Sequence, residues 1–291
     1  MWWGIVCSMK DDKIIFILNK NEDFYINKIE VGRQWQNIDV WAEINEDILL
    51  IIEDKVETSE HSNQLERYRQ IAQDEYVGQN VQIFCSYIKT GNEPNAVLSK
   101  IREKGYHTIE RNDILSCIGK YCSCHLLLQD YYTHLKNIDT LTQSYQTKLM
   151  KDWDWYAWQG FYKELEKHLV GANWGYVANP SGGFLGMWWH FEETDDAEIY
   201  LQFEQSKLCF KITVEEVESR TDIRSKYYTI LCDNSIDYPE IKRPERFGTG
   251  TYMTIACVDV ENLWGESIIN ISDVAKKLHE YEAIVSKCAE M

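Results

Sequence analysis

Residues 37–55 read NIDVWAEINEDILLIIEDK and decide the fold of the first part of the chain. Two apolar-rich segments flank a polar turn at 45–47, a pattern that predicts a β-hairpin. If the hairpin folds about Glu46, the numbers of antiparallel partners sum to 92, so Asp39 faces Glu53. Residues that oppose each other directly in such a pair have Cβ atoms about 5 Å apart. Two carboxylates at that separation repel each other unless a cation lies between them.

Lys55 follows Glu53 by two positions, so the strand period of two places both side chains on one face. This face therefore offers two oxygen ligands for a hard divalent ion and an ammonium group, the groups that metal-assisted phosphodiester hydrolysis requires. The plain alternative is a solvated face on which Lys55 pairs with an acid. The apolar run 49–52 argues against it, because such a run is typical of a strand buried on both faces.

The helix predicted over 61–73 adds polar groups soon after the hairpin. Gln64 and Tyr68 are four residues apart and share one helix face. The alternative is an ordinary amphipathic helix in which the tyrosine packs and the glutamine is solvated. Arg67 and Arg69 could contact phosphates of a substrate. His61 could also reach the substrate, with a solvated loop position as the alternative.

The composition is that of a globular protein, with 44% hydrophobic and 26% charged residues in 291. No apolar stretch reaches about eighteen residues and no signal sequence opens the chain, so no membrane association is expected. Nine scattered cysteines suit reduced thiols and predict a cytoplasmic protein. The net charge of −17 argues against a broad nucleic-acid clamp. Residues 1–150 carry 16 basic and 22 acidic side chains, so most of the negative charge lies in the second half.

The first half alternates strand and helix patterns and predicts a mixed α/β sheet. Besides the hairpin, the strands are expected at 13–18, 23–31, 80–88 and 106–109, and the helices at 61–73, 93–104, 113–122 and 124–136. We expect one domain over residues 1–140 and a joint over 141–154, where the sequence is polar and has no strong period.

The second half, residues 155–291, predicts an α+β accessory domain. Strands are expected at 174–178, 183–191, 197–204, 207–214 and 250–259, and helices at 155–169, at 216–232 and from Ser272, with Ser272 and Asp273 as the N-cap. Six tryptophans could stack on bases, but few basic residues lie near them. Core packing, or a surface for a partner protein or a second copy of the chain, is therefore favoured. The six tryptophans are Trp153, Trp155, Trp158, Trp174, Trp188 and Trp189.

Three short motifs resemble the PD-(D/E)xK nuclease superfamily. They are WQNID at 35–39, IEDK at 52–55 and NQLERY at 63–68, and they look most like a bacterial branch with the pattern W-x-N-I-D, I-E-N-K and N-Q-L-x-R-Y. The similarity covers about residues 25–140. The acid with E-x-K is a weak motif alone, and the trailing Q-x-x-x-Y makes it more specific.

The resemblance implies a restriction-endonuclease-like core that binds Mg²⁺ or Mn²⁺. Asp39, Glu53 and the backbone carbonyl of Asp54 would be the metal ligands. Lys55 would orient the attacking water or stabilise charge on the phosphate. Gln64 would support a ligand or contact the substrate.

The resemblance also implies a metal-dependent nuclease, acting on DNA, in bacterial defence or DNA processing. Relatives open with a helix whose acid completes the site, whereas this chain reaches strand-like sequence by Lys13, and its nearest upstream acids are Glu22 and Glu30. The alternative is therefore a catalytically impaired nuclease fold that binds nucleic acid or protein.

Overall fold

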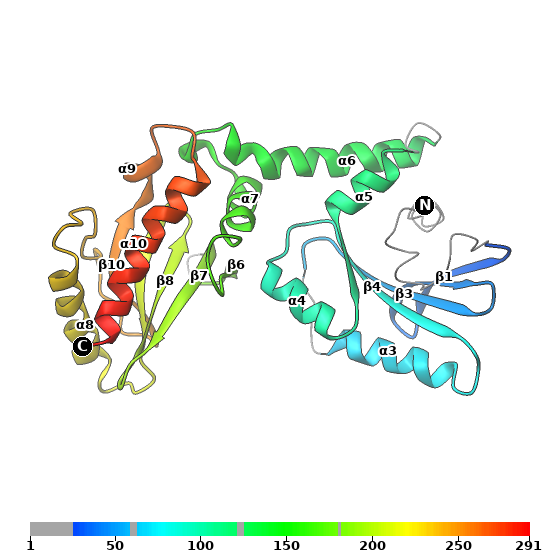
Figure 1. The fold of residues 1–291 in the computed structure, drawn as a ribbon, viewed down its shortest axis with the longest axis horizontal. Coiled ribbons are helices and arrows are strands. Elements are labelled where there is room, and N and C mark those ends of the chain that lie inside the picture. The colour runs from blue at the N-terminus through cyan, green and yellow to red at the C-terminus, as the bar shows by residue number, and fades with distance from the viewer. Residues whose placement is uncertain (1–25, 59–62, 121–124, 180–181) are drawn as a thin grey trace. The chain divides into compact units, whose positions relative to one another are not determined.

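The computed structural model describes residues 26–58, 63–120, 125–179 and 182–291. They form two compact units (Figure 1). The first holds the residues up to Glu93 together with Val97–Thr140, and the second holds Pro94–Ala96 and Leu141–Met291. Among the described helices, none combines the length and the apolar character that crossing a bilayer requires.

The first unit is a mixed α/β fold around a five-stranded sheet in the order β1-β2-β3-β4-β5. Strands β1 to β3 are antiparallel, whereas β3, β4 and β5 run parallel. The strands are β1 (Ile29–Trp35), β2 (Ile38–Ile44), β3 (Ile48–Lys55), β4 (Gln82–Lys89) and β5 (His107–Glu110), and the helices are α3 (Gln64–Glu75), α4 (Asn95–Glu103), α5 (Arg111–Ile118) and α6 (Leu126–Gln143).

The hairpin of β2 and β3 has the predicted register. Its pairs run from Ile44 with Ile48 to Val40 with Ile52, all with numbers that sum to 92. Asn45 and Glu46 both have positive φ, 54° and 62°, in the three-residue connection between the paired residues Ile44 and Ile48.

Helices cover both faces of this sheet, which explains the apolar run in β3 (Figure 1). On one face Leu49 and Ile51 pack with residues of α3 and α4. On the other face Ile52 packs with residues of α5 and α6. The polar end of β3 is therefore attached to a strand that has no solvent-facing side.

The second unit is built on another five-stranded sheet, antiparallel throughout, in the order β10-β9-β8-β7-β6. Its helices pack on one face, where they share one core with alternate strand residues (Figure 1). The strands are β6 (Asn173–Val177), β7 (Phe184–Glu193), β8 (Glu198–Glu204), β9 (Lys207–Thr213) and β10 (Tyr252–Asp259), and the helices are α7 (Trp155–Leu165), α8 (Arg220–Asn234), α9 (Val260–Trp264) and α10 (Ile271–Ala289).

Most of the tryptophans of this unit are core residues. Trp153, Trp158, Trp174 and Trp189 are at most 9% exposed and belong to its hydrophobic core. Trp155 is 37% exposed and Trp188 is half-buried. Core packing, the interpretation favoured from the sequence, therefore holds for four of the six.

Several predicted boundaries were wrong. The strand expected at 23–31 is β1, which starts at Ile29 and continues to Trp35 because the next turn uses positive φ at Gln36 and Asn37. The N-cap of α10 is Asn270, whose side chain accepts from the amide of Ser272 at 2.9 Å, in place of the expected Ser272 and Asp273. Helix α9 was not predicted. The strand expected at 13–18 lies outside the described residues.

The turn of the hairpin gives a stability prediction. Asn45→Ala should lower the free energy of unfolding by about 1–2 kcal/mol, because alanine tolerates the left-handed conformation poorly and removes an acceptor. The Asn45 Oδ1 atom accepts from the amides of Asn27 at 2.8 Å and Lys28 at 3.1 Å. Urea unfolding of the variant measures the change.

The matched substitution is Glu46→Gly, which should raise the free energy of unfolding. Glycine adopts positive φ without strain, and the Lys28–Glu46 ion pair that is lost is exposed. A fall for this variant would contradict the assignment of strain to the turn.

Candidate active site

The hairpin brings the two predicted carboxylates to one end of the sheet. Asp39 follows the last registered pair, Val40 with Ile52, so it lies beside the end of β3. One carboxylate oxygen of Asp39, Oδ2, accepts a hydrogen bond from the backbone amide of Asp54 at 3.2 Å. The Asp39 side chain is thereby held next to Glu53.

Glu53 is the most constrained group of the site, since its side chain is 1% exposed. Its Oε1 atom accepts from Nε2 of Gln64 at 2.9 Å and forms an ion pair with Nζ of Lys55. Its Oε2 atom is buried and has no hydrogen-bond partner among the described residues. A buried carboxylate oxygen without a donor is costly, and a bound cation is one way to satisfy it.

The ionisation of this pair follows from burial and from the neighbouring charges. Burial raises the pKa of Glu53, and the Asp39 carboxylate raises it further, while the contact with Lys55 acts in the opposite direction. Burial lowers the pKa of Lys55, but the hydrogen bond and charge of Glu53, together with the charge of Asp39, raise it above its ordinary value. Lys55 is therefore an ammonium group at neutral pH.

Gln64 and Tyr68 lie together on the face of α3 that looks toward Glu53. Helix α3 begins at Gln64, directly after Asn63 in the left-handed conformation. The amide nitrogen of Gln64 donates to Glu53 and also to the hydroxyl of Tyr68, at 2.8 Å. Both of its hydrogens are used, so the structure shows Gln64 orienting the Glu53 carboxylate.

The other predicted contacts are dispersed. The guanidinium of Arg67 lies over the ring of Tyr68, 5.4 Å from its centroid. Arg69 donates to the carbonyl of Lys104, just after α4, at 3.2 Å. The Asp54 side chain is exposed. His61 lies outside the described residues, as does Glu22. Glu30 is registered with Glu43 and pairs with Lys28, so it lies at the opposite end of the hairpin from Asp39.

Lys89 and Glu93 form a second buried ion pair beside the site, which the sequence did not reveal. Their side chains are 2% and 1% exposed, and Lys89 Nζ lies 3.0 Å from Glu93 Oε2. Lys89 is registered with Lys55 on the neighbouring strand, and Tyr87 donates to Glu93 at 3.1 Å. The strand was predicted to end at Ile88, which placed Lys89 in a turn, and only the parallel pairing of β3 with β4 could have revealed it.

This pair fastens the segment that follows Lys55. Lys89 Nζ donates to the carbonyl of Thr58 at 2.7 Å. A Cβ atom on Gly91 would lie 2.2 Å from the Val56 carbonyl oxygen, so only glycine permits this approach. Residues 56–58, which follow β3, are therefore held against the loop after β4.

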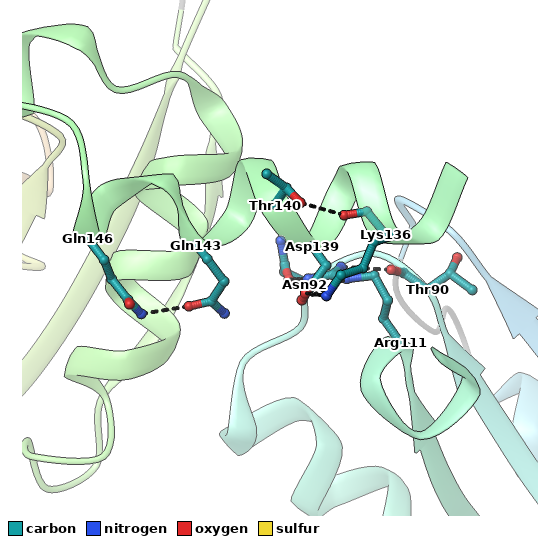
Figure 2. A network of polar contacts seen from close by, with 8 residues as sticks. All are labelled: Thr90, Asn92, Arg111, Lys136, Asp139, Thr140, Gln143 and Gln146. Carbon is teal, nitrogen blue, oxygen red and sulfur yellow. Dashed lines mark hydrogen bonds and ion pairs between the residues drawn. The ribbon is translucent and has the colours of Figure 1, made fainter. Parts of the chain in front are cut away.

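Arg111 holds that loop from its other side (Figure 2). Its guanidinium is buried and donates to the carbonyl of Thr90 and the side chain of Asn92, both at 2.9 Å. Its Nε atom lies 3.8 Å from a carboxylate oxygen of Asp139 on α6. Helices α5 and α6 thus support the loop on which the Thr58 segment rests.

The residues present suit a hard divalent ion. Asp39 and Glu53 supply two carboxylates, one of them with an unsatisfied buried oxygen, and Mg²⁺ commonly takes one or two protein carboxylates with water and substrate phosphate completing its shell. Within the described part of the chain, no group of three or more His, Cys, Asp or Glu side chains is placed to hold a metal. The candidate ligands among the described side chains are therefore these two carboxylates.

Comparison with known proteins agrees with the motifs. Residues 9–145 match the family model of the PD-(D/E)XK nuclease superfamily. The match spans β1–β5 and helices α3–α6, and it confirms for this part of the chain the superfamily that the motifs resembled. The chain matches no curated protein. It also matches no solved structure.

The Lys89–Glu93 pair generates a stability prediction. Lys89→Met should lower the free energy of unfolding by about 3 kcal/mol or more, because it leaves the Glu93 carboxylate buried without its cation. The control is Lys104→Met, which breaks an ion pair with Glu66 at a partly exposed position and should cost at most about 1 kcal/mol. Equal losses for the two variants in denaturant unfolding would show that the buried pair has no special role.

Proposed function

We propose that this protein is a metal-dependent nuclease that hydrolyses phosphodiester bonds, with DNA as its substrate. The observation that carries the proposal is the meeting of Asp39 and Glu53 at the buried end of β3, with Lys55 and Gln64 on the same Glu53 carboxylate. The match of residues 9–145 to a nuclease superfamily supports it independently.

The proposed ligands are the carboxylates of Asp39 and Glu53 and the backbone carbonyl of Asp54, and the proposed ion is Mg²⁺ or Mn²⁺. Bound there, the ion would polarise the phosphodiester and lower the pKa of a coordinated water. Gln64 keeps Glu53 oriented by donating to its Oε1 atom. Lys55 holds its proton and presents a positive charge where negative charge develops on the phosphate.

The wider context of the proposal is a role in bacterial defence or DNA processing, in the cytoplasm. This context rests on analogy within the superfamily, and a fold by itself does not fix a function. The tryptophan-rich second unit would then supply contacts with a partner protein or a second copy of the chain.

One observation favours a second candidate function, a catalytically impaired nuclease fold that binds nucleic acid or protein. Among the described residues only two carboxylates gather at the site, and no third acid joins them. The net charge of −17 also opposes nonspecific binding to DNA. Cleavage separates the two candidates.

The test of catalysis is plasmid and oligonucleotide cleavage with Mg²⁺ and with Mn²⁺. Glu53→Ala and Lys55→Ala should each lower the rate by at least about 100-fold, a loss of about 2.7 kcal/mol of transition-state stabilisation. Gln64→Ala should lower it roughly 10- to 100-fold, because it acts through the orientation of Glu53.

The matched control is Glu75→Ala, which removes an exposed carboxylate at the far end of α3 and should leave the rate unchanged. Activity that persists in Glu53→Ala would indicate a contaminating enzyme. Absence of cleavage by the unaltered protein with both metals would reject the nuclease and leave the binding module.

Metal binding can be tested without activity. In EDTA, Asp39→Asn should melt at a higher temperature than the unaltered protein, because the Asp39 charge opposes that of the buried Glu53. Saturating Mn²⁺ should stabilise the unaltered protein, by about 2.7 kcal/mol at a hundredfold excess over Kd, and should not stabilise the variant. Equal stabilisation of both proteins by Mn²⁺ would place the ion elsewhere.

A further inference from the structure

The sheet of the second unit has one face that its helices do not cover. Along β8, Ile199, Leu201 and Phe203 belong to the core shared with the helices. Because strand side chains alternate, Tyr200 and Gln202 point to the opposite face. Both are nevertheless at most 7% exposed, so other side chains on that face surround them.

Aromatic side chains make up much of the uncovered face around Tyr200 and Gln202. A cavity of about 410 Å³ opens on the face, within the size range of small-molecule sites. Phe191 and Tyr200 stack with ring centroids 4.8 Å apart and an interplanar angle of 16°. The aromatic residues that line the cavity are Phe184, Trp188, Phe191, Tyr200 and Tyr252.

A polar cluster lies among these rings. Lys211 is 8% exposed, and its Nζ atom lies 3.2 Å from Glu204 Oε1 and 3.3 Å from Thr254 Oγ1. Gln202 donates to the same Glu204 oxygen at 3.0 Å. Gln202, Glu204 and Lys211 all line the cavity, so a ligand there meets hydrogen-bond donors and acceptors as well as flat apolar surfaces.

A second cavity, of about 550 Å³, adjoins the first, because Glu204 lines both. Four cationic side chains line it, and none of them forms an ion pair among the described residues: Lys207, Lys242, Arg243 and Arg246. The acids of its lining include Asp259, which accepts from the amide of Glu261 at 3.1 Å and caps α9. With Glu204, Glu245 and Glu261, the cavity has four acidic side chains in its lining.

We propose that this face binds a nucleotide, with the base among the aromatic rings and the phosphate beside the cations. A base is flat, stacks on aromatic side chains and carries donors and acceptors at its edge, which Gln202, Glu204 and Lys211 can meet. A phosphate is the anion that unpaired lysine and arginine side chains bind. A purely apolar ligand would make no use of the partly buried Lys211–Glu204 ion pair, and an inorganic anion would make no contact with the aromatic rings.

The nucleotide can be free or part of a single strand, since both present the same base and phosphate. The site lies within the second unit and uses none of the residues proposed for hydrolysis. The inference therefore stands apart from the nuclease proposal.

The test is titration calorimetry on the full chain in EDTA, so that no hydrolysis enters the measurement. Adenosine 5′-monophosphate should bind saturably at one site, and adenosine and inorganic phosphate should each bind at least about tenfold more weakly, because each supplies half of the contacts. Tighter binding of a short oligoadenylate would identify a strand as the source of the nucleotide, and equal or weaker binding would identify the free nucleotide.

Two substitutions test the base-binding and the phosphate-binding parts of the site separately. Tyr252 is 67% exposed, so its substitution should not unfold the sheet. Tyr252→Leu should weaken both adenosine and its monophosphate about tenfold, whereas Tyr252→Phe keeps the ring and the affinity. Arg246→Ser should weaken the monophosphate alone. The matched control for charge is Lys276→Ser on the exposed side of α10, which should change neither.

Two results would overturn the proposal. One is the absence of saturable binding for both the monophosphate and the oligoadenylate. The other is binding that Tyr252→Leu and Arg246→Ser leave unchanged. Neither result bears on cleavage, so this proposal and the nuclease proposal fail separately.

Discussion

The first unit depends on the burial of one carboxylate at the end of an apolar strand. Glu53 continues a run whose two faces are covered by helices, so its charge cannot reach solvent. Lys55 and Gln64 both contact the Oε1 atom of Glu53, and Asp39 adds a second negative charge near this carboxylate. Hydrogen bonds from Lys89 to the Thr58 carbonyl and from Arg111 to the Thr90 carbonyl hold the two segments that follow β3 and β4.

Much of this geometry could be predicted because it is local. The register of the hairpin follows from the three-residue turn at 45–47 and the strand period of two, and both are visible in residues 37–55. The sharing of one helix face by Gln64 and Tyr68 follows from their spacing of four. In each case a rule that needs only neighbouring residues was sufficient to bring the right side chains together.

The rest required contacts between distant segments. Lys89 lies beside Lys55 only because β3 and β4 pair in parallel. No local sequence pattern around Lys89 predicts this position. The cavities of the second unit combine side chains from several strands with the segment around Arg246, whose positions are set by the whole sheet. The roles of Asp39, Glu53 and Lys55 in catalysis remain predictions.

The ion pair of Glu53 with Lys55 also bears on how a metal ion would enter the folded protein. Because the Lys55 ammonium lies against the Glu53 carboxylate, this pair offsets part of the cost of burying the end of β3 without a divalent ion. If Glu53 binds a metal as proposed, the incoming ion would compete with the Lys55 ammonium for this carboxylate. We expect a substrate phosphate to draw that ammonium toward itself, so that metal and substrate occupy the site most readily together.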